Sequence, residues 1–161
     1  MFLAPPLPYA GFWLRFAAYL IDGVIMGICF IPVIAILALA TGAGAALSHI
    51  QNSPPEDFVF PAAVIMFVLL LIVAIIGGAW LYYALMESST WQATLGKRAI
   101  GLMVTDIEGK RLTFGHATGR YFAKMITGMV PLAIGYIMAG FTQKKQALHD
   151  FIAATLVLKR M

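Results

Sequence analysis

The sequence contains little charge and a single cysteine. Charged residues make up 11% of its 161 residues and hydrophobic residues make up 61%, whereas soluble domains carry about 25% charged residues. This composition excludes an ordinary soluble domain and indicates an integral membrane protein. The one cysteine, Cys29, has no intrachain partner, so disulfides cannot hold the fold together.

Residues suited to metal or nucleophilic chemistry are also scarce. The chain has three histidines, so His149-Asp150 lacks the further ligands that a metal phosphohydrolase needs. The stretch Thr94-Leu95-Gly96-Lys97 ends like a phosphate loop, but Trp91 stands where the first glycine belongs and Arg98 replaces the required Ser or Thr. We therefore expect no enzyme, no metal and no cofactor.

The net charge of +4 raises the question of nucleic acid. The basic residues lie beside apolar runs, where Lys and Arg usually report cytoplasmic orientation and contact with anionic lipid. We expect the lipid bilayer as partner and no nucleic acid.

Two long apolar runs predict two transmembrane helices, at residues 12–41 and 62–86. The second run carries no charge and the first carries Asp22 within its apolar stretch, and about 20 apolar residues suffice to cross a bilayer as helix. Residues 42–61 between them are rich in Gly and Pro, and their only full charges are acidic. They predict a loop outside the cell.

Residues 87–116 are polar and basic, which predicts a cytoplasmic segment. The same rule places both termini in the cytoplasm, and we expect a multi-pass protein of the bacterial cell (inner) membrane. A turn-rich Asp-Ile-Glu-Gly-Lys stretch predicts a β-hairpin over residues 100–114. Residues 154–159 predict a C-terminal strand that joins it.

Residues 117–143 predict a broken helical segment. The uncharged stretch Met125–Phe141 reaches the lower limit for a span, but Gly128, Pro131 and Gly135 interrupt it. We prefer a re-entrant segment over a single crossing, because re-entry keeps the basic clusters on one side. The predicted fold is an all-α membrane protein of one domain (residues 1–161), with two full spans, this broken segment and a small cytoplasmic hairpin or three-stranded sheet.

Asp22 is the strongest candidate for function. A charged side chain inside a membrane costs roughly 2.5 to 3.5 kcal/mol on insertion scales, so such residues commonly mark ion or proton pathways. Arg15 shares a helix face with Asp22, about 10 Å away along the axis. Asp22 is either a proton or cation ligand with Arg15 as a modulating charge, or a structural acceptor with Arg15 reaching toward lipid headgroups.

Further candidates lie elsewhere on the chain. Asp150 is predicted either to cap the segment that follows or to pair with Arg15 or a loop base. Gly23 and Gly27 form a small-xxx-small pair that favours helix packing. The secondary candidates for an ion or proton pathway are Glu87, Asp106 and His149.

Several of these residues together resemble the RDD family of membrane proteins, named for one arginine and two aspartates. The resemblance covers residues 9–159 and rests on Arg15 through Asp22, Glu87-Ser88-Ser89 with Thr94 through Arg98 and Gly101, Val104 through Gly109, and Leu148-His149-Asp150 with Ala154-Thr155. It implies that Arg15 is the family arginine, Asp22 one aspartate, and Asp150 the other, with Asp106 as the alternative. It also implies a role in transport, including sodium/proton antiport for some members.

Two functions follow as expectations. The first is a small ion transporter in which Asp22 exchanges a proton for a cation. The alternative is a non-catalytic accessory or assembly subunit of a larger membrane complex. Two full spans enclose little, so we expect a homo-oligomer or partner membrane subunits.

Overall fold

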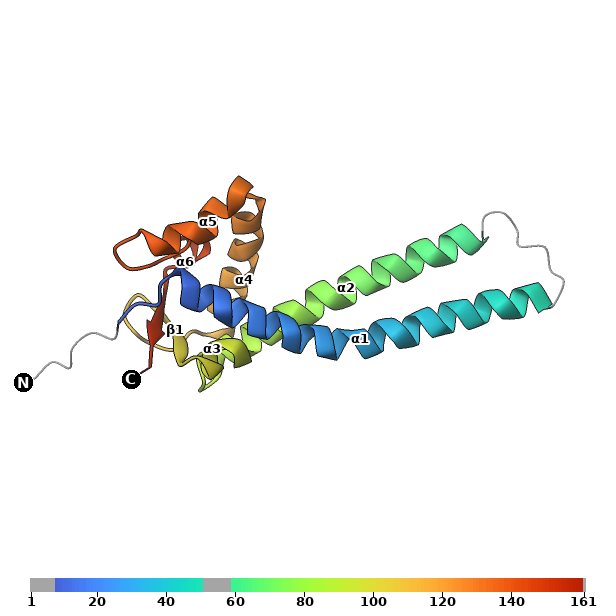
Figure 1. Ribbon diagram of the computed structural model, residues 1–161, viewed down its shortest axis with the longest axis horizontal. Coiled ribbons are helices and arrows are strands. Elements are labelled where there is room, and N and C mark those ends of the chain that lie inside the picture. Colours follow the sequence, from blue (N-terminus) through green and yellow to red (C-terminus); the bar gives the residue numbers. More distant parts are fainter. Residues whose placement is uncertain (1–7, 51–58, 161) are drawn as a thin grey trace, which may run out of the picture. The chain divides into compact units, whose positions relative to one another are not determined.

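The computed structural model describes residues 8–50 and 59–160 (Figure 1). The chain divides into two compact units, a terminal unit of Met1–Gly23 with Trp80–Met161 and a central unit of Val24–Ala79. The elements are α1 (Phe12–Ile50), α2 (Val59–Ser88), α3 (Leu95–Ala99), β1 (Leu102–Asp106), α4 (Phe114–Met129), the 3-10 turn η1 (Pro131–Ala133), α5 (Ile134–Ile137), the 3-10 turn η2 (Met138–Gly140), α6 (Leu148–Ile152) and β2 (Thr155–Lys159).

The predicted fold class is confirmed. Two helical stretches, Phe12–Ile36 and Val64–Ser88, are long and apolar enough to cross a membrane. A third, bent pair joins Phe114–Met129 to Pro131–Gly140, and a two-stranded antiparallel sheet completes the fold.

The central unit contains only helix in the residues that the structure describes. Its apolar side chains, such as Ile28 and Val73, are largely exposed, as expected of helices solvated by lipid. Gly78 permits a close approach within this unit, because a Cβ there would lie 2.8 Å from the ring of Phe30.

Both helices are longer than the sequence predicts. The predicted loop 42–61 is wrong for residues 42–50 and 59–61, which are helical, while residues 51–58 lie outside the described part of the chain. The reason is the alanine and leucine content around Gly42, since these strong helix formers offset a cost of about 1 kcal/mol per helical glycine.

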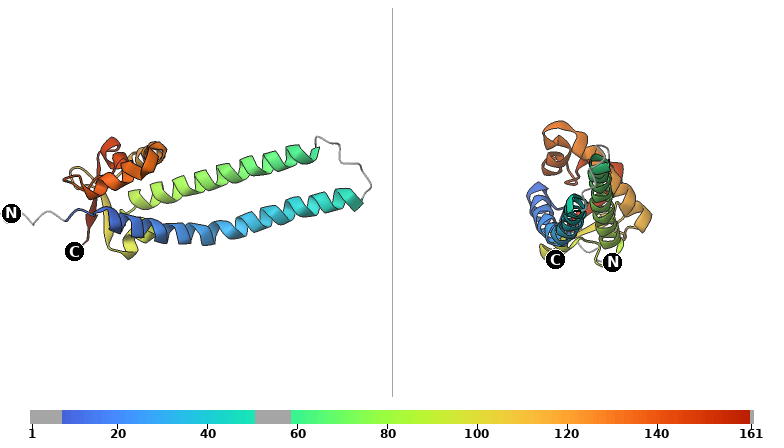
Figure 2. Two further views of the ribbon diagram at one scale, coloured as in Figure 1. Left: turned by 45° about the horizontal axis from the view of Figure 1, so that its top comes forward. Right: turned by 90° about the vertical axis from the view of Figure 1, so that its right-hand side faces the viewer.

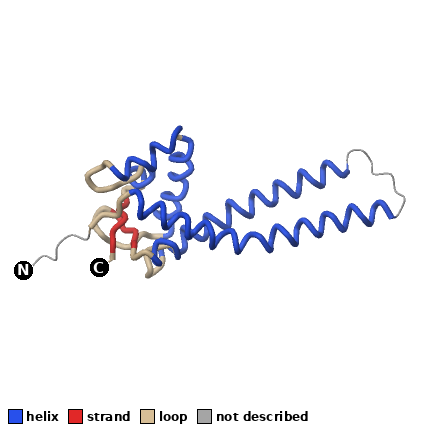
Figure 3. Tube along the Cα trace, viewed as in Figure 1, coloured by secondary structure: helices blue, strands red, loops and turns tan. Residues whose placement is uncertain are grey.

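The sheet lies in the terminal unit, where β1 and β2 run side by side (Figure 3). The register pairs Leu102 with Lys159 and Asp106 with Thr155. The chain before α1 adds a bridge between Tyr9 and Leu158. The strand predicted at 154–159 is therefore confirmed in its position, and its pairing with the preceding polar segment is as expected.

The second strand of the predicted hairpin does not form. The predicted turn exists, with Gly109 at φ +82° and a hydrogen bond from the Asp106 N–H to the Lys110 carbonyl. Residues 111–114 then lead into α4, because the Thr113 hydroxyl accepts a hydrogen bond from the His116 N–H and caps that helix. The sheet is two-stranded, not three-stranded.

The predicted break in the third helical segment is present. The axes of α4 and the helical turns after Pro131 bend by 115°, and the turn can be followed in Figures 1 and 2. Proline lacks an N–H and cannot continue a helix, and Leu132 and Ala133 both have positive φ. The segment runs over 114–140, close to the predicted 117–143.

Candidate functional site

A group of buried charged residues, which we call the ionic cluster, lies inside the terminal unit. Five helices supply its members, α1, α2, α3, α4 and α6. The members are Arg15, Glu87, Lys97, Arg120, Lys124 and Asp150.

Arg120 lies at the centre of the ionic cluster and is 1% exposed. Its Nη1 lies 2.7 Å from Glu87 and its Nη2 lies 2.6 Å from Asp150. Its Nε donates to the Thr155 hydroxyl at 3.0 Å. The planar guanidinium thus joins two carboxylates from different helices, a geometry that lysine cannot reproduce.

Arg15 connects the start of α1 to α6 and to the segment before it. Its Nη1 pairs with Asp150, its Nε donates to the Ala10 carbonyl, and its Nη2 donates to the Lys145 carbonyl at 2.6 Å. Burial alone would raise the pKa of Asp150, but Arg120 and Arg15 outweigh burial and hold that pKa well below its usual range. Asp150 is therefore ionised at physiological pH.

Glu87 is shared by two lysines in addition to Arg120. Lys97 Nζ lies 2.5 Å from Glu87, and Lys124 Nζ lies 3.5 Å from the same oxygen and 4.0 Å from the centre of the Tyr83 ring. Burial lowers the pKa of Lys97 to about 7, although Glu87 opposes the shift. Four cationic side chains thus share two carboxylates.

Asp22 lies apart from the ionic cluster and is 1% exposed. Its carboxylate accepts hydrogen bonds from the Tyr82 hydroxyl at 2.7 Å, the Thr94 hydroxyl at 2.6 Å and the Gly96 N–H at 2.8 Å. A Cβ on Gly96 would lie 2.3 Å from the Ala18 carbonyl oxygen. Only glycine allows this approach, and Asp22 ties α1 to α2 and α3.

His149 is buried beside the cluster. Its Nε2 lies 3.4 Å from Asp150, and its Nδ1 has no hydrogen-bond partner in the part of the chain that the structure describes. Burial lowers the pKa of His149 well below its usual range, against the opposing effect of Asp150. The ring is therefore neutral.

A cavity of about 490 Å³ opens onto the cluster. All four cations line it, together with Asp22 and His149, whereas Glu87 and Asp150 are not among its lining residues. Its aromatic walls comprise Phe12, Phe16, Tyr19, Tyr83, Tyr121 and Tyr136. The lining is therefore mostly apolar and aromatic, and its four cations outnumber its one carboxylate, that of Asp22.

The structure brings most of the predicted candidates together. Arg15, Asp150 and Glu87 belong to the ionic cluster, and Asp22 and His149 line the same cavity. Arg15 and Asp22 hold separate partners, because Arg15 pairs with Asp150 whereas Asp22 accepts from Tyr82.

Three other predicted residues, Asp106, Gly23 and Gly27, lie outside the ionic cluster and do not line the cavity. Asp106 accepts hydrogen bonds from the Glu108 and Lys110 N–H groups within an exposed turn. A Cβ on Gly23 or Gly27 would meet nothing within 4 Å, so no described segment of this chain packs closely against the predicted helix-packing pair.

Sequence reasoning missed Arg120, Lys97, Lys124 and Thr94. A signal existed for two of them, because Thr94 and Lys97 lie in the motif that carries the family resemblance. Arg120 and Lys124 are four residues apart on α4, so they share one helix face.

Comparison with known proteins decides the family. The model of the RDD family matches residues 9–154. This chain belongs to the RDD family. It is 38% identical over 149 residues to "Uncharacterized protein YxaI" of Bacillus subtilis (strain 168), covering 92% of this chain and 96% of that protein. It is 31% identical over 160 residues to "Uncharacterized membrane protein YteJ" of the same organism, covering 93% of this chain and 80% of that one.

No solved structure matches this chain. The geometry nevertheless bears on the family's residues, because Arg15 pairs with Asp150 while Asp106 holds a surface turn. This favours Asp150 as the second aspartate of the RDD family. Among residues 8–50 and 59–160 no three His, Cys, Asp or Glu side chains are grouped to hold a metal ion.

Proposed function

We propose that this RDD protein is a small proton-linked membrane transporter whose working site is the ionic cluster with its cavity. The observation that carries the proposal is the charge imbalance, in which four cations share two carboxylates and line a cavity whose one acidic lining residue is Asp22, so that the cations remain in excess. Uncompensated buried charge is costly. The imbalance is relieved either by loss of a proton or by binding of an anion.

Lys97 is the group best suited to that exchange. Its pKa of about 7 makes it half protonated near neutral pH. It faces Glu87 from α2, and Arg120 and Lys124 from α4 are the other charges that act on it. Protonated Lys97 favours an anion in the cavity, and neutral Lys97 favours its release, so the two events are linked.

Exchange of a cation at Asp22, the expectation from sequence, receives less support from the geometry. Three donors already occupy the Asp22 carboxylate. The four cations that line the same cavity repel a cation that approaches Asp22. The transport proposal therefore moves from Asp22 to the ionic cluster.

For topology, we propose that both termini and the segment with β1 face the cytoplasm. β2 pairs with β1 and forms a bridge with Tyr9, and paired strands require one compartment. Residues between β1 and β2 then cross the membrane an even number of times, in line with the 115° bend. The positive-inside rule assigns this side to the cytoplasm.

Labelling from outside tests this topology. In a Cys29→Ser background, a membrane-impermeant thiol reagent should reach Ser53→Cys and leave Lys159→Cys unlabelled in intact cells. Equal labelling of both positions would show that the sides were assigned wrongly. Permeabilised cells, in which both positions should react, provide the control.

Reconstitution of the purified protein in liposomes tests the function. With a pH-sensitive dye inside, we expect proton movement when a gradient of a membrane-impermeant organic anion is imposed, and none with a sodium or potassium gradient. Lys97→Met should abolish the movement, whereas Lys110→Met, at an exposed ion pair with Glu108, should preserve it. Movement driven by a cation gradient would restore the Asp22 model. A protein that is inert alone and copurifies with a fixed partner would establish the accessory-subunit alternative.

A further inference from the structure

We infer that the cavity of the terminal unit binds an anionic amphiphile, with a phosphate-bearing headgroup against its cations and an acyl chain along its exposed apolar rim. The inference rests on the proposed function, because it names the ligand class of the same cavity. The experiments measure ligand binding separately from transport, so a failure of the binding inference can be distinguished from a failure of the proposed function.

Two of the cations, Lys124 and Arg15, are partly exposed and therefore accessible to a negatively charged ligand. Lys124 reaches Glu87 only at 3.5 Å, and its side chain is 20% exposed. Arg15 is also partly accessible on the cavity wall, with its side chain 12% exposed. A phosphate at this wall would gain charge-assisted hydrogen bonds from both residues.

His149 supplies a second, independent observation. It lines the cavity, and its buried Nδ1 has no hydrogen-bond partner among residues 8–50 and 59–160. Because Nε2 lies 3.4 Å from Asp150, the neutral ring is expected to carry its proton there, which makes Nδ1 an acceptor. A buried acceptor without a partner is unfavourable, and a hydroxyl on the ligand's headgroup would satisfy it.

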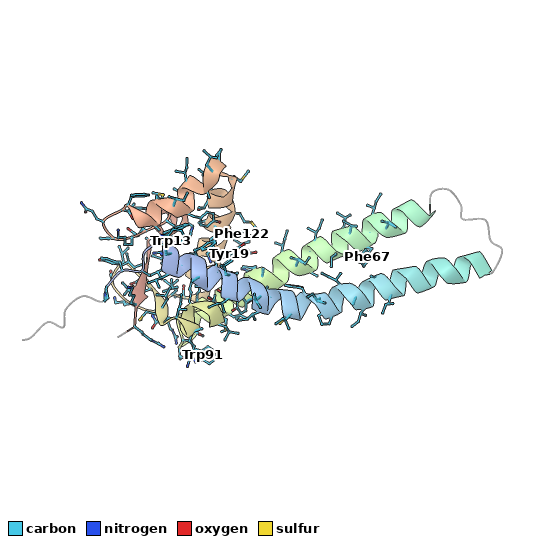
Figure 4. The ribbon with its side chains drawn as sticks, in the orientation of Figure 1. Trp13, Tyr19, Phe67, Trp91 and Phe122 are labelled. Atoms are coloured by element: carbon cyan, nitrogen blue, oxygen red, sulfur yellow. The ribbon has the colours of Figure 1, made fainter. Side chains whose placement is uncertain are left out.

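The rim of the cavity suits an acyl chain. Phe16 and Met125 both line the cavity, yet they are 43% and 41% exposed. Exposed apolar side chains continue from Met125 along α4 to Phe122 and Met129. Figure 4 labels Tyr19 and Phe122, which lie on α1 and α4 of the terminal unit. In a membrane protein such a surface contacts lipid chains.

This combination discriminates among ligand classes. A cavity of about 490 Å³ is within the range of roughly 300 to 1,000 Å³ typical of small-molecule sites. An uncharged ligand would leave the excess cations uncompensated, and a cation would be repelled. A free inorganic anion would compensate the charge but make no use of the aromatic wall or the apolar rim.

Calorimetric titration of the full chain in an uncharged detergent tests the inference. The probes are short-chain phosphatidylglycerol, which carries phosphate, hydroxyls and acyl chains, short-chain phosphatidylcholine, and glycerol 3-phosphate. We expect saturable binding of phosphatidylglycerol and at least about tenfold weaker binding of the other two. Equal binding of glycerol 3-phosphate would overturn the role of the acyl chain, and equal binding of phosphatidylcholine would overturn the role of charge.

Two variants with a matched control localise the site. Lys124→Gln should weaken phosphatidylglycerol binding about tenfold or more, Lys124→Arg should retain it, and the exposed Lys110→Gln should leave it unchanged. Met125→Ser changes a side chain that is 41% exposed, so it serves even if Lys124→Gln fails to fold. It should weaken phosphatidylglycerol binding severalfold and leave binding of glycerol 3-phosphate unchanged. Wild-type affinity for phosphatidylglycerol in folded Met125→Ser or folded Lys124→Gln overturns the inference.

Discussion

The two units differ in where they place apolar and charged side chains, although α1 and α2 contribute residues to both. In the central unit, apolar side chains such as Ile28 and Val73 face outward and no charged residue occurs in its described part. In the terminal unit, charges lie inside, with Glu87, Arg120 and Asp150 each at most 1% exposed. The comparison shows that a chain with few charged residues can bury several of them together in one cluster.

The surroundings of Asp22 show the same difference. Asp22 lies within the stretch Phe12–Ile36, which is long and apolar enough to cross a membrane. Its hydrogen bonds nevertheless come from residues of the terminal unit, Tyr82, Thr94 and Gly96. The Asp22 carboxylate is therefore solvated by protein groups, whereas the apolar side chains of the central unit are exposed.

The largest effect is expected from Arg120→Met. The change leaves Glu87 and Asp150 without their shared central partner, and removing one member of a buried ion pair typically costs 3 to 5 kcal/mol, so we expect a loss of about that size. Thermal unfolding in detergent and abundance in the membrane measure it. Lys110→Met, at an exposed pair, is the matched control and should cost less than about 1 kcal/mol. A loss of stability below about 1 kcal/mol for Arg120→Met would show that the ionic cluster does not stabilise the terminal unit.

Asp22 offers the next largest test. Asp22→Leu removes the acceptor of two buried donors, the Thr94 hydroxyl and the Gly96 N–H, and should cost about 3 kcal/mol or more, whereas Asp22→Asn should cost about 1 to 3 kcal/mol because its amide oxygen still accepts and Thr94 can turn its hydroxyl. Thermal unfolding of both variants measures this. In liposomes, Asp22→Asn should keep proton movement if the ionic cluster is the working site. Loss of movement in a folded Asp22→Asn protein would return the proton pathway to Asp22.

Gly96 tests the close approach that makes the Asp22 contacts possible. Gly96→Ala introduces a Cβ 2.3 Å from the Ala18 carbonyl oxygen, so the chain must shift, and overpacking of this kind costs typically 1 to 3 kcal/mol. Gly119→Ala in α4 is the matched control, since a Cβ there meets nothing within 4 Å and alanine favours helix. Comparison of their unfolding midpoints decides the question. Equal midpoints for the two variants would show that α1 and α3 have room to separate.

The sequence predicted the features that depend on local pattern. Apolar runs located both spans, Pro131 located the break, and the stretch 154–159 with the β-branched Thr155 and Val157 located β2. The extension of α1 to Ile50 was missed because glycine and alanine compete there, and the propensity of alanine prevailed. The absent hairpin strand was missed because Thr113 caps a helix, a role that a short polar stretch did not reveal.

The candidate site was predicted only in part, because charge pairing depends on long-range contacts. Arg15, Asp22 and Asp150 were identified since they are unusual in their local context. Arg120 joins Glu87, 33 positions earlier, to Asp150, 30 positions later, and no local pattern indicates such pairing. What separates a titrating group from a structural acceptor is the set of partners, which only the fold provides.

The smallest expected effect concerns the protonation of Lys97. Because the pKa of Lys97 is about 7 in the folded protein and 10.5 as its ordinary value, the unfolded chain binds more protons between these two values. Stability therefore rises with pH in that window, and the contribution of Lys97 is lost as pH falls to 7. Between pH 7 and pH 8 the gain is about 1 kcal/mol, or roughly 2 to 4 °C in Tm for a chain of this size. Thermal unfolding at closely spaced pH values measures the slope. Lys97→Met should flatten it, Lys110→Met should retain it, and an unchanged slope in Lys97→Met would exclude Lys97 as the group that exchanges a proton.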